Sequence, residues 1–154
     1  MIKKITVSFL IICLLSACGY SRLDKLTNSD YSFSDINITG NKSIGYLIKN
    51  ELRLIDNNDS KNNIYLDLNV KSKKNISEKN EKNQITKFSI EISVEAILKD
   101  NTRTVFAKEN FSVKDNYKVE KNSINTQNNQ KKLRQRLTRK ISNRINMFVS
   151  SYFE

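Results

Sequence analysis

The strongest constraint on the fold is a long alternation of apolar and polar side chains across residues 87–99. The apolar positions are Phe88, Ile90, Ile92, Val94, Ala96 and Leu98. The polar positions are Lys87, Ser89, Glu91, Ser93, Glu95 and Lys99. Because neighbouring side chains of a strand point to opposite faces, this pattern predicts a long strand with one buried and one solvated face. Such a strand belongs to a sheet that is covered on one side.

Three further strands are predicted from the same kind of alternation. The first spans residues 31–38, with one slip that suggests a bulge, and the second spans residues 64–71. The third spans residues 105–113 and is joined to strand 87–99 by a tight turn at Asp100 and Asn101. Glu109 breaks its alternation, which suggests a bulge or an edge position. The polar residues 72–84 are predicted to form a long, solvated hairpin loop.

Two segments have apolar residues at helical spacing. In residues 43–55 this stripe consists of Ile44, Leu47, Ile48, Leu52 and Ile55. In the last part of the chain it consists of Leu133, Leu137, Ile141, Ile145, Phe148 and Tyr152. This second helix has a basic opposite face, interpreted as solvated, with Lys131, Lys132, Arg136, Arg139 and Lys140. The Asn-rich residues 115–130 before it are predicted as a loop or a frayed lead-in.

The predicted element order is therefore β-α-β-β-β-α. The β-α-β step favours a parallel strand pair with a right-handed crossover, and the next two connections are hairpins. The predicted fold class is α/β: a two-layer sandwich in which a four-stranded mixed sheet carries both helices on one face. The other face of the sheet stays open to water or to a partner.

The first residues have the plan of a secretory signal peptide. Lys3 and Lys4 precede the apolar run Ile5–Leu15, which is too short to span a membrane, and Ser16 and Ala17 lead into Cys18. A small residue before a cysteine looks like the lipobox of bacterial lipoproteins, in which the cysteine sulfur receives a diacylglycerol and the peptidase cuts before it. The alternative is an ordinary signal peptide with a chance cysteine. We expect a signal peptide at 1–17, a lipidated N-terminus and tether at 18–30, and a single domain at 31–154.

The composition argues against most catalytic chemistry. The chain has no His, and Cys13 leaves with the signal peptide while Cys18 is consumed by lipid, so we expect no metal site and no thiol nucleophile. Only three Gly occur, so no glycine-rich phosphate loop is present. A carboxylate pair such as Glu91 and Glu95 would lie about 13 Å apart along a strand, too far for most paired-carboxylate reactions. We expect no catalytic residue and no cofactor, and the composition favours a binding or assembly module.

The charge balance suggests an anionic partner. The full chain carries a net charge of +11, and removing the two signal-peptide lysines leaves 25 basic residues against 16 acidic ones, or +9. For an exported, lipid-anchored protein, anionic head groups or phosphorylated glycolipids are more plausible ligands than nucleic acid. The competing explanation is a biased base composition of the genome, which would also account for the many Asn, Lys and Ile residues.

The lipobox, the following Cys18-Gly19-Tyr20 and the β-α-β-β-β-α order together resemble the LPS-assembly lipoprotein family, LptE. Its members commonly begin their mature chains Cys-Gly-Phe or Cys-Gly-Tyr. They also commonly follow a long third strand and its hairpin partner with a loop and a closing helix, as residues 85–113 and 133–153 do here. The resemblance covers nearly the whole mature chain of 137 residues. The very high Asn and Lys content and the lack of Pro depart from the usual pattern of the family.

The resemblance implies a lipoprotein on the inner leaflet of the outer membrane that plugs an LptD-like β-barrel, aids its assembly and helps place lipopolysaccharide in the outer leaflet. Family members bind lipopolysaccharide, and Gly19 after the cysteine fits an outer-membrane location. Candidate anion contacts are Lys73 and Lys74 at the first hairpin, with Arg103 and Lys108 near the second. Each is also explained as a solvated surface charge. The alternative function is a free-standing periplasmic lipoprotein that binds anionic lipid or cell-wall components without a barrel partner.

Overall fold

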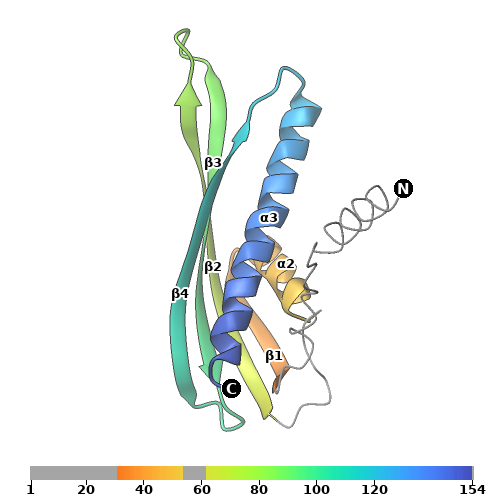
Figure 1. The fold of residues 1–154 in the computed structure, drawn as a ribbon, viewed down its shortest axis with the longest axis vertical. Coiled ribbons are helices and arrows are strands. Elements are labelled where there is room, and N and C mark those ends of the chain that lie inside the picture. The colour runs from red at the N-terminus through yellow and green to blue at the C-terminus, as the bar shows by residue number, and fades with distance from the viewer. Residues whose placement is uncertain (1–30, 54–61, 154) are drawn as a thin grey trace, which may run out of the picture.

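The structure, a computed structural model, describes residues 31–53 and 62–153. Its elements are β1 (Tyr31–Gly40), α2 (Lys42–Arg53), β2 (Asn62–Lys79), β3 (Ile85–Lys99), β4 (Val105–Lys118) and α3 (Ser123–Ser150). The strands form one sheet in the order β1-β2-β3-β4, with β1 parallel to β2 and the other two pairs antiparallel. Both helices lie against the same face of this sheet (Figure 1). The predicted α/β two-layer sandwich with a four-stranded mixed sheet is confirmed.

The connection from β1 into α2 is a sharp turn at Gly40 and Asn41. Gly40 has a positive φ of 77°, and a Cβ at this position would lie 2.2 Å from the carbonyl oxygen of Val70. Only glycine accepts both conditions at low cost. Asn41 then donates its backbone N–H to the same carbonyl at 2.7 Å, and its side chain accepts from Ile44 N at 3.2 Å. The chain is therefore fixed to β2 where α2 begins.

The core lies between the helical layer and one face of the sheet. The alternating apolar residues of β2 and β3 predicted to face it are buried, except for Phe88, which is partly buried. Most of each helical stripe is buried too, but Tyr152 of the second stripe lies beyond α3 and is 51% exposed. Leu47 is the exception on α2, because it is 39% exposed at the side of the helix that faces α3. Ile55 lies outside the described residues. The slip in β1 is a register shift between Phe33 and Asp35, as predicted.

The hairpin of β2 and β3 is longer than the sequence predicted. Residues 72–79 are not a loop: they continue β2 and pair with residues 85–92 of β3. This extension is held by cross-strand contacts, including the ion pair between Lys87 and Glu78 at 2.5 Å and the ammonium of Lys74 over the Phe88 ring. The turn itself is short, because the Asn80 side chain accepts from the backbone N–H of Lys82 and Gln84 at 3.1 and 2.9 Å.

The prediction of a loop or a frayed lead-in at residues 115–130 is wrong for most of its length, because only residues 119–122 lie outside β4 and α3. β4 continues to Lys118, since Tyr117 is buried opposite Phe88 and its ring stacks on that ring at 5.8 Å. α3 begins at Ser123, where the Asn122 side chain accepts from Ile124 N at 2.8 Å and caps the helix. The first ten residues of α3 contain one apolar side chain, Ile124, so they have no helical stripe to detect. For Glu109 the sequence left two alternatives, a bulge or an edge position. The edge position is correct, because β4 is an edge strand and its pairing with β3 has no register shift at Glu109.

The molecule is elongated along the strands and has two distinct ends (Figure 1). The lower end in Figure 1 holds the start of β1, the turn between β3 and β4, and the C-terminus of α3. There the hydroxyl of buried Tyr31 donates to the side-chain oxygen of buried Asn146, which ties β1 to α3. The upper end holds the turn between β2 and β3 and the connection from β4 into α3. None of the helices in the described parts of the chain combines the length and the apolar content that crossing a bilayer requires.

Candidate anion-binding surfaces

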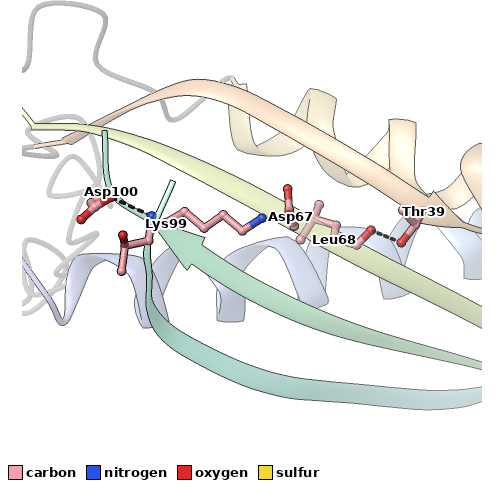
Figure 2. Close-up of polar contacts among 6 residues, drawn as sticks. Thr39, Asp67, Leu68, Lys99 and Asp100 are labelled. Atoms are coloured by element: carbon pink, nitrogen blue, oxygen red, sulfur yellow. Dashed lines mark hydrogen bonds and ion pairs between the residues drawn. The ribbon is translucent and has the colours of Figure 1, made fainter. Parts of the chain in front are cut away.

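The uncovered face of the sheet is polar and carries paired charges. Across the three longest strands, positions in register on this face include Asn69, Glu95 and Asn110, and next to them Lys71, Ser93 and Ser112. Figure 2 shows Lys99 reaching from the end of β3 to Asp67 on β2, with an ion-pair distance of 2.5 Å. The same view shows the Thr39 hydroxyl of β1 directed at the carbonyl of Leu68, 3.4 Å away. This face is thus suited to contact a polar surface rather than an apolar one.

Lys73 and Lys74 lie within β2, not in a hairpin loop. As neighbours on a strand they point to opposite faces of the sheet. Lys73 is exposed on the open face, in register with Glu91. Lys74 is on the helix side, where its Nζ lies 4.1 Å from the centre of the Phe88 ring and 5.7 Å from that of Tyr117. The cation–π contacts give Lys74 a structural role in addition to any ligand contact.

Arg103 and Lys108 lie towards the lower end of the molecule. Arg103 is in the β3–β4 turn with a φ of 66°, and its guanidinium carbon stands 3.7 Å from the centre of the Tyr65 ring. Lys108 on β4 pairs with Glu95 at 2.6 Å, and this hydrogen bond lowers the pKa of the Glu95 carboxyl. The structure therefore does not gather the four candidate cations into one site: two lie along β2, and two lie near the β3–β4 turn.

The carboxylates Glu91 and Glu95 do not have the environment of an acid–base pair. Lys108 stabilises the charged form of Glu95, whereas a general acid needs a raised pKa. Glu91 accepts a hydrogen bond from the Ser112 hydroxyl at 3.4 Å. Among residues 31–53 and 62–153, no cluster of three or more His, Cys, Asp or Glu side chains could hold a metal ion.

The structure gathers basic residues at a different place, in a groove between α2 and α3. This α2–α3 groove holds about 620 Å³. Leu47 and Glu51 line it from α2, and the α3 side consists of Lys132, Gln135, Arg136, Thr138, Arg139, Lys140 and Asn143. Four cations thus face one carboxylate. The sequence did reveal the basic helix face, but the opposite wall comes from residues 81 to 96 positions earlier, so the groove itself could not be predicted.

Two of the four groove cations already form ion pairs with nearby carboxylates. Arg136 Nη2 lies 2.6 Å from Asp115 Oδ2, and Arg139 Nε lies 3.6 Å from Glu51 Oε2. Lys132 and Lys140 have no ion-pair partner within the part of the chain that the structure describes. They are the groove charges that remain available to an external anion.

A buried hydroxyl adds a polar group to the same groove. Thr138 is 2% exposed and lines the groove, and its Oγ1 has no hydrogen-bond partner among the described atoms. Ser142, one turn further along α3, is fully buried, and its Oγ is equally unsatisfied within the described residues. A buried hydroxyl without a partner is uncommon and can donate to an anion. The groove therefore offers two ammonium groups to an external anion, while the Thr138 hydroxyl lies buried behind them.

Comparison with known proteins identifies the fold. No family model and no curated protein matches the chain. Among solved structures, rare lipoprotein B from Shewanella oneidensis matches with a TM-score of 0.56 at 12% identity, over 77% of this chain and 95% of that one. A minor lipoprotein from Acinetobacter baumannii matches with a TM-score of 0.59 at 11% identity, over 80% and 92%. Lipoprotein B from Nitrosomonas europaea matches with 0.58 at 14%, over 81% and 88%.

Proposed function

We propose that this chain, which has the fold of the rare lipoprotein B structures, is an outer-membrane lipoprotein of the LPS-assembly (LptE) family. In this role it is anchored through lipid on Cys18 on the periplasmic side of the outer membrane. It partners and plugs an LptD-like β-barrel, aids the assembly of that barrel, and helps insert lipopolysaccharide into the outer leaflet. The role is one of binding and assembly, not of catalysis.

The observation that carries the proposal is the agreement of two independent parts of the chain. Residues 31–53 and 62–153 adopt a fold that resembles the Shewanella lipoprotein, the match covering 95% of that chain at only 12% identity. The first 20 residues, which lie outside the described fold, independently carry the lipobox and Cys18-Gly19-Tyr20. A lipidation signal and a lipoprotein fold rarely occur in one chain by chance, so together they support the proposal more strongly than either feature does by itself.

The surface chemistry supports insertion into a barrel. The interior of a large outer-membrane barrel is polar, and an inserted domain must match it. The open sheet face, with its Lys99–Asp67 and Lys108–Glu95 pairs, meets this requirement without exposing an apolar sheet.

Lipopolysaccharide phosphates would find suitable partners on this surface. Lys132 and Lys140 of the α2–α3 groove are candidates in addition to Lys73, Lys74, Arg103 and Lys108, since ammonium and guanidinium groups form strong charge-assisted hydrogen bonds to phosphate. Lys108 is the weakest of the candidates, because binding a phosphate there would compete with Glu95.

The decisive experiment is a mild-detergent pull-down of the full-length lipoprotein from its own membranes, with stoichiometry from mass spectrometry. We expect a single large outer-membrane barrel at a ratio of one to one. Recovery of the protein alone, or with peptidoglycan or inner-membrane proteins, would reject the plug function and favour a free-standing lipoprotein that binds anionic lipid or cell wall.

The anion contacts are tested by reversing charges at matched sites. We expect Lys132→Glu/Lys140→Glu to weaken lipopolysaccharide binding at least about tenfold, because two attractive contacts become repulsive and 1.4 kcal/mol corresponds to a factor of ten. The control is Lys42→Glu/Lys121→Glu, which makes the same change in net charge at two exposed positions outside the groove. Equal weakening by both double variants would mean that the overall charge, and not the groove, attracts the ligand.

A further inference from the structure

Each edge of the sheet is formed by a strand with one free side. β1 and β4 are the outer strands, and β4 is 14 residues long. The free side of an edge strand carries unpaired N–H and C=O groups, to which a strand of another molecule can bind. α2 packs beside β1 and α3 packs beside β4 (Figure 1). Each helix therefore has side chains within reach of one free edge.

Arg144 of α3 binds a carbonyl on the free side of β4. Its Nη1 donates to the carbonyl oxygen of Ser112 at 3.1 Å. Val119 N donates to the carbonyl of Thr86 in β3 at 2.9 Å, and bonded residues alternate along an antiparallel strand. Ser112 is seven residues before Val119 with no register shift between them, so its N–H and C=O point away from β3. The guanidinium therefore takes the place of the N–H group that an added strand would use.

Lys49 of α2 makes the equivalent contact at β1. Its Nζ donates to the carbonyl oxygen of Ile36 at 2.7 Å. In a parallel pair, a carbonyl bonds to the residue next to its register partner. Leu68 is in register with Ile38, and its carbonyl faces β1, where the Thr39 hydroxyl donates to it at 3.4 Å. The backbone groups of Ile38, and of Ile36 two residues earlier, therefore point away from β2, and Lys49 binds at the free edge.

Other features also make the two edges unsuited to pairing. β1 has a register shift between Phe33 and Asp35, and Lys49 Nζ lies 3.6 Å from the Asp35 carboxylate. On β4, Glu109 and Asp115 alternate with the open-face positions and thus lie on the side of the strand that faces the helices. Bulges and inward-directed charges on an edge strand discourage pairing.

We propose that Lys49 and Arg144 close the two edges of the sheet to strands of other molecules. A partner then binds the faces, the helices or the turns of the domain, and its own sheet does not continue this one. When the cations are removed, the freed edges pair with those of a second copy of this chain. The inference rests on contacts within the described domain, so it holds with or without the barrel of the proposed function.

Removal of the two cations tests the inference. The variant is Lys49→Ala/Arg144→Ala in the full-length lipidated chain. The control is Lys42→Ala/Arg139→Ala, which removes one cation from each helix without a bond to a strand carbonyl in the described structure. Sedimentation velocity in detergent counts protein copies per micelle over a range of protein concentrations. We expect the self-association constant to rise at least about tenfold in the variant only, since one or two main-chain hydrogen bonds suffice for this change.

A proline on the free side of β4 locates the association. Asn110 lies two residues before Ser112, so its N–H also points away from β3, and proline at this position removes no bond of the ladder. We expect Arg144→Ala alone to associate through β4. Adding Asn110→Pro should return the protein to one copy per micelle, whereas adding Asn110→Ala, the matched control, should not.

Three results would contradict the inference. If Lys49→Ala/Arg144→Ala associates no more than the unchanged protein, the two cations do not guard the edges. If the control double variant associates equally, the loss of charge is the cause. If association of Arg144→Ala survives Asn110→Pro, the contact lies elsewhere. Lys49 is partly buried, so circular dichroism checks the fold, and Arg144→Ala, at an exposed position, decides alone if the double variant is unfolded.

Discussion

At the scale of single residues, Gly45 lets α2 approach β1 closely. This glycine is buried in α2, and a Cβ added to it would lie 2.3 Å from Cγ2 of Ile38 on β1. The branched Ile38 side chain cannot easily turn away. We expect Gly45→Ala to destabilise the protein by about 1–3 kcal/mol through overpacking, despite the better helix propensity of alanine. Chemical denaturation measures this change.

Two variants test the cause of the Gly45 effect. Asn50→Ala, at an exposed position of the same helix, should be neutral or slightly stabilising. Adding Ile38→Ala to Gly45→Ala removes the clashing methyl group, so the double variant should be more stable than the sum of the single effects predicts. Strict additivity would show that the two side chains do not meet.

Asp100 makes the β3–β4 turn sensitive to acid. Its Oδ1 accepts from the backbone N–H of Thr102 and Thr104 at 2.8 and 2.9 Å, and the hydrogen bonds from these two residues, led by that of the Thr102 hydroxyl, lower its pKa. Because the folded pKa is below the unfolded one, the stabilisation is complete above the unfolded value of about 4 and is lost as the pH falls through the folded value. We expect the Asp100 carboxyl resonance to titrate below about pH 4, and a midpoint above that value would contradict the hydrogen bonding.

At the scale of elements, the start of α3 depends on one cap. Asn122 has an extended backbone and its side chain accepts from Ile124 N, whereas the following turn contributes almost no apolar burial. Asn122→Ala should cost about 1 kcal/mol and expose the first turn of α3 to amide hydrogen exchange. Asn125→Ala is the control inside the helix, where alanine should not destabilise. Similar losses in both variants would mean that the cap is unimportant.

The elements with an apolar period could be predicted from the sequence, and those formed by polar residues could not. The strand from Lys87 to Lys99 and the stripe from Leu133 to Ile145 pack their apolar faces against the core. The spacing of their apolar residues is therefore enough to identify the strand and the helix. Residues 72–79 and 115–118 become strands because β3 offers them partners, such as Phe88 beside Lys74 and Tyr117. Pairing across a sheet is not visible within either segment alone. The α2–α3 groove was missed for the same reason, since Leu47 and Lys132 meet only after folding.

At the scale of the whole molecule, one core carries the stability of the described domain, and α3 closes it. Ile141 is fully buried between α3 and the sheet. We expect Ile141→Ala to lower the free energy of unfolding by about 2–5 kcal/mol. Met147→Ala on the same helix, at a position 67% exposed, should change it by less than about 0.5 kcal/mol. A small loss at Ile141 would show that the helix is only loosely docked.

The order of the strands in space follows their order in the chain. Each new strand therefore adds to the free edge of the sheet already formed, and no segment has to be inserted between two others. A polypeptide that emerges from a channel with its N-terminus first could build β1, β2, β3 and β4 one after another, with α3 arriving last to cover the apolar face. With this topology the whole sheet can form before the C-terminus emerges. Only the last step, the docking of α3, needs the end of the chain.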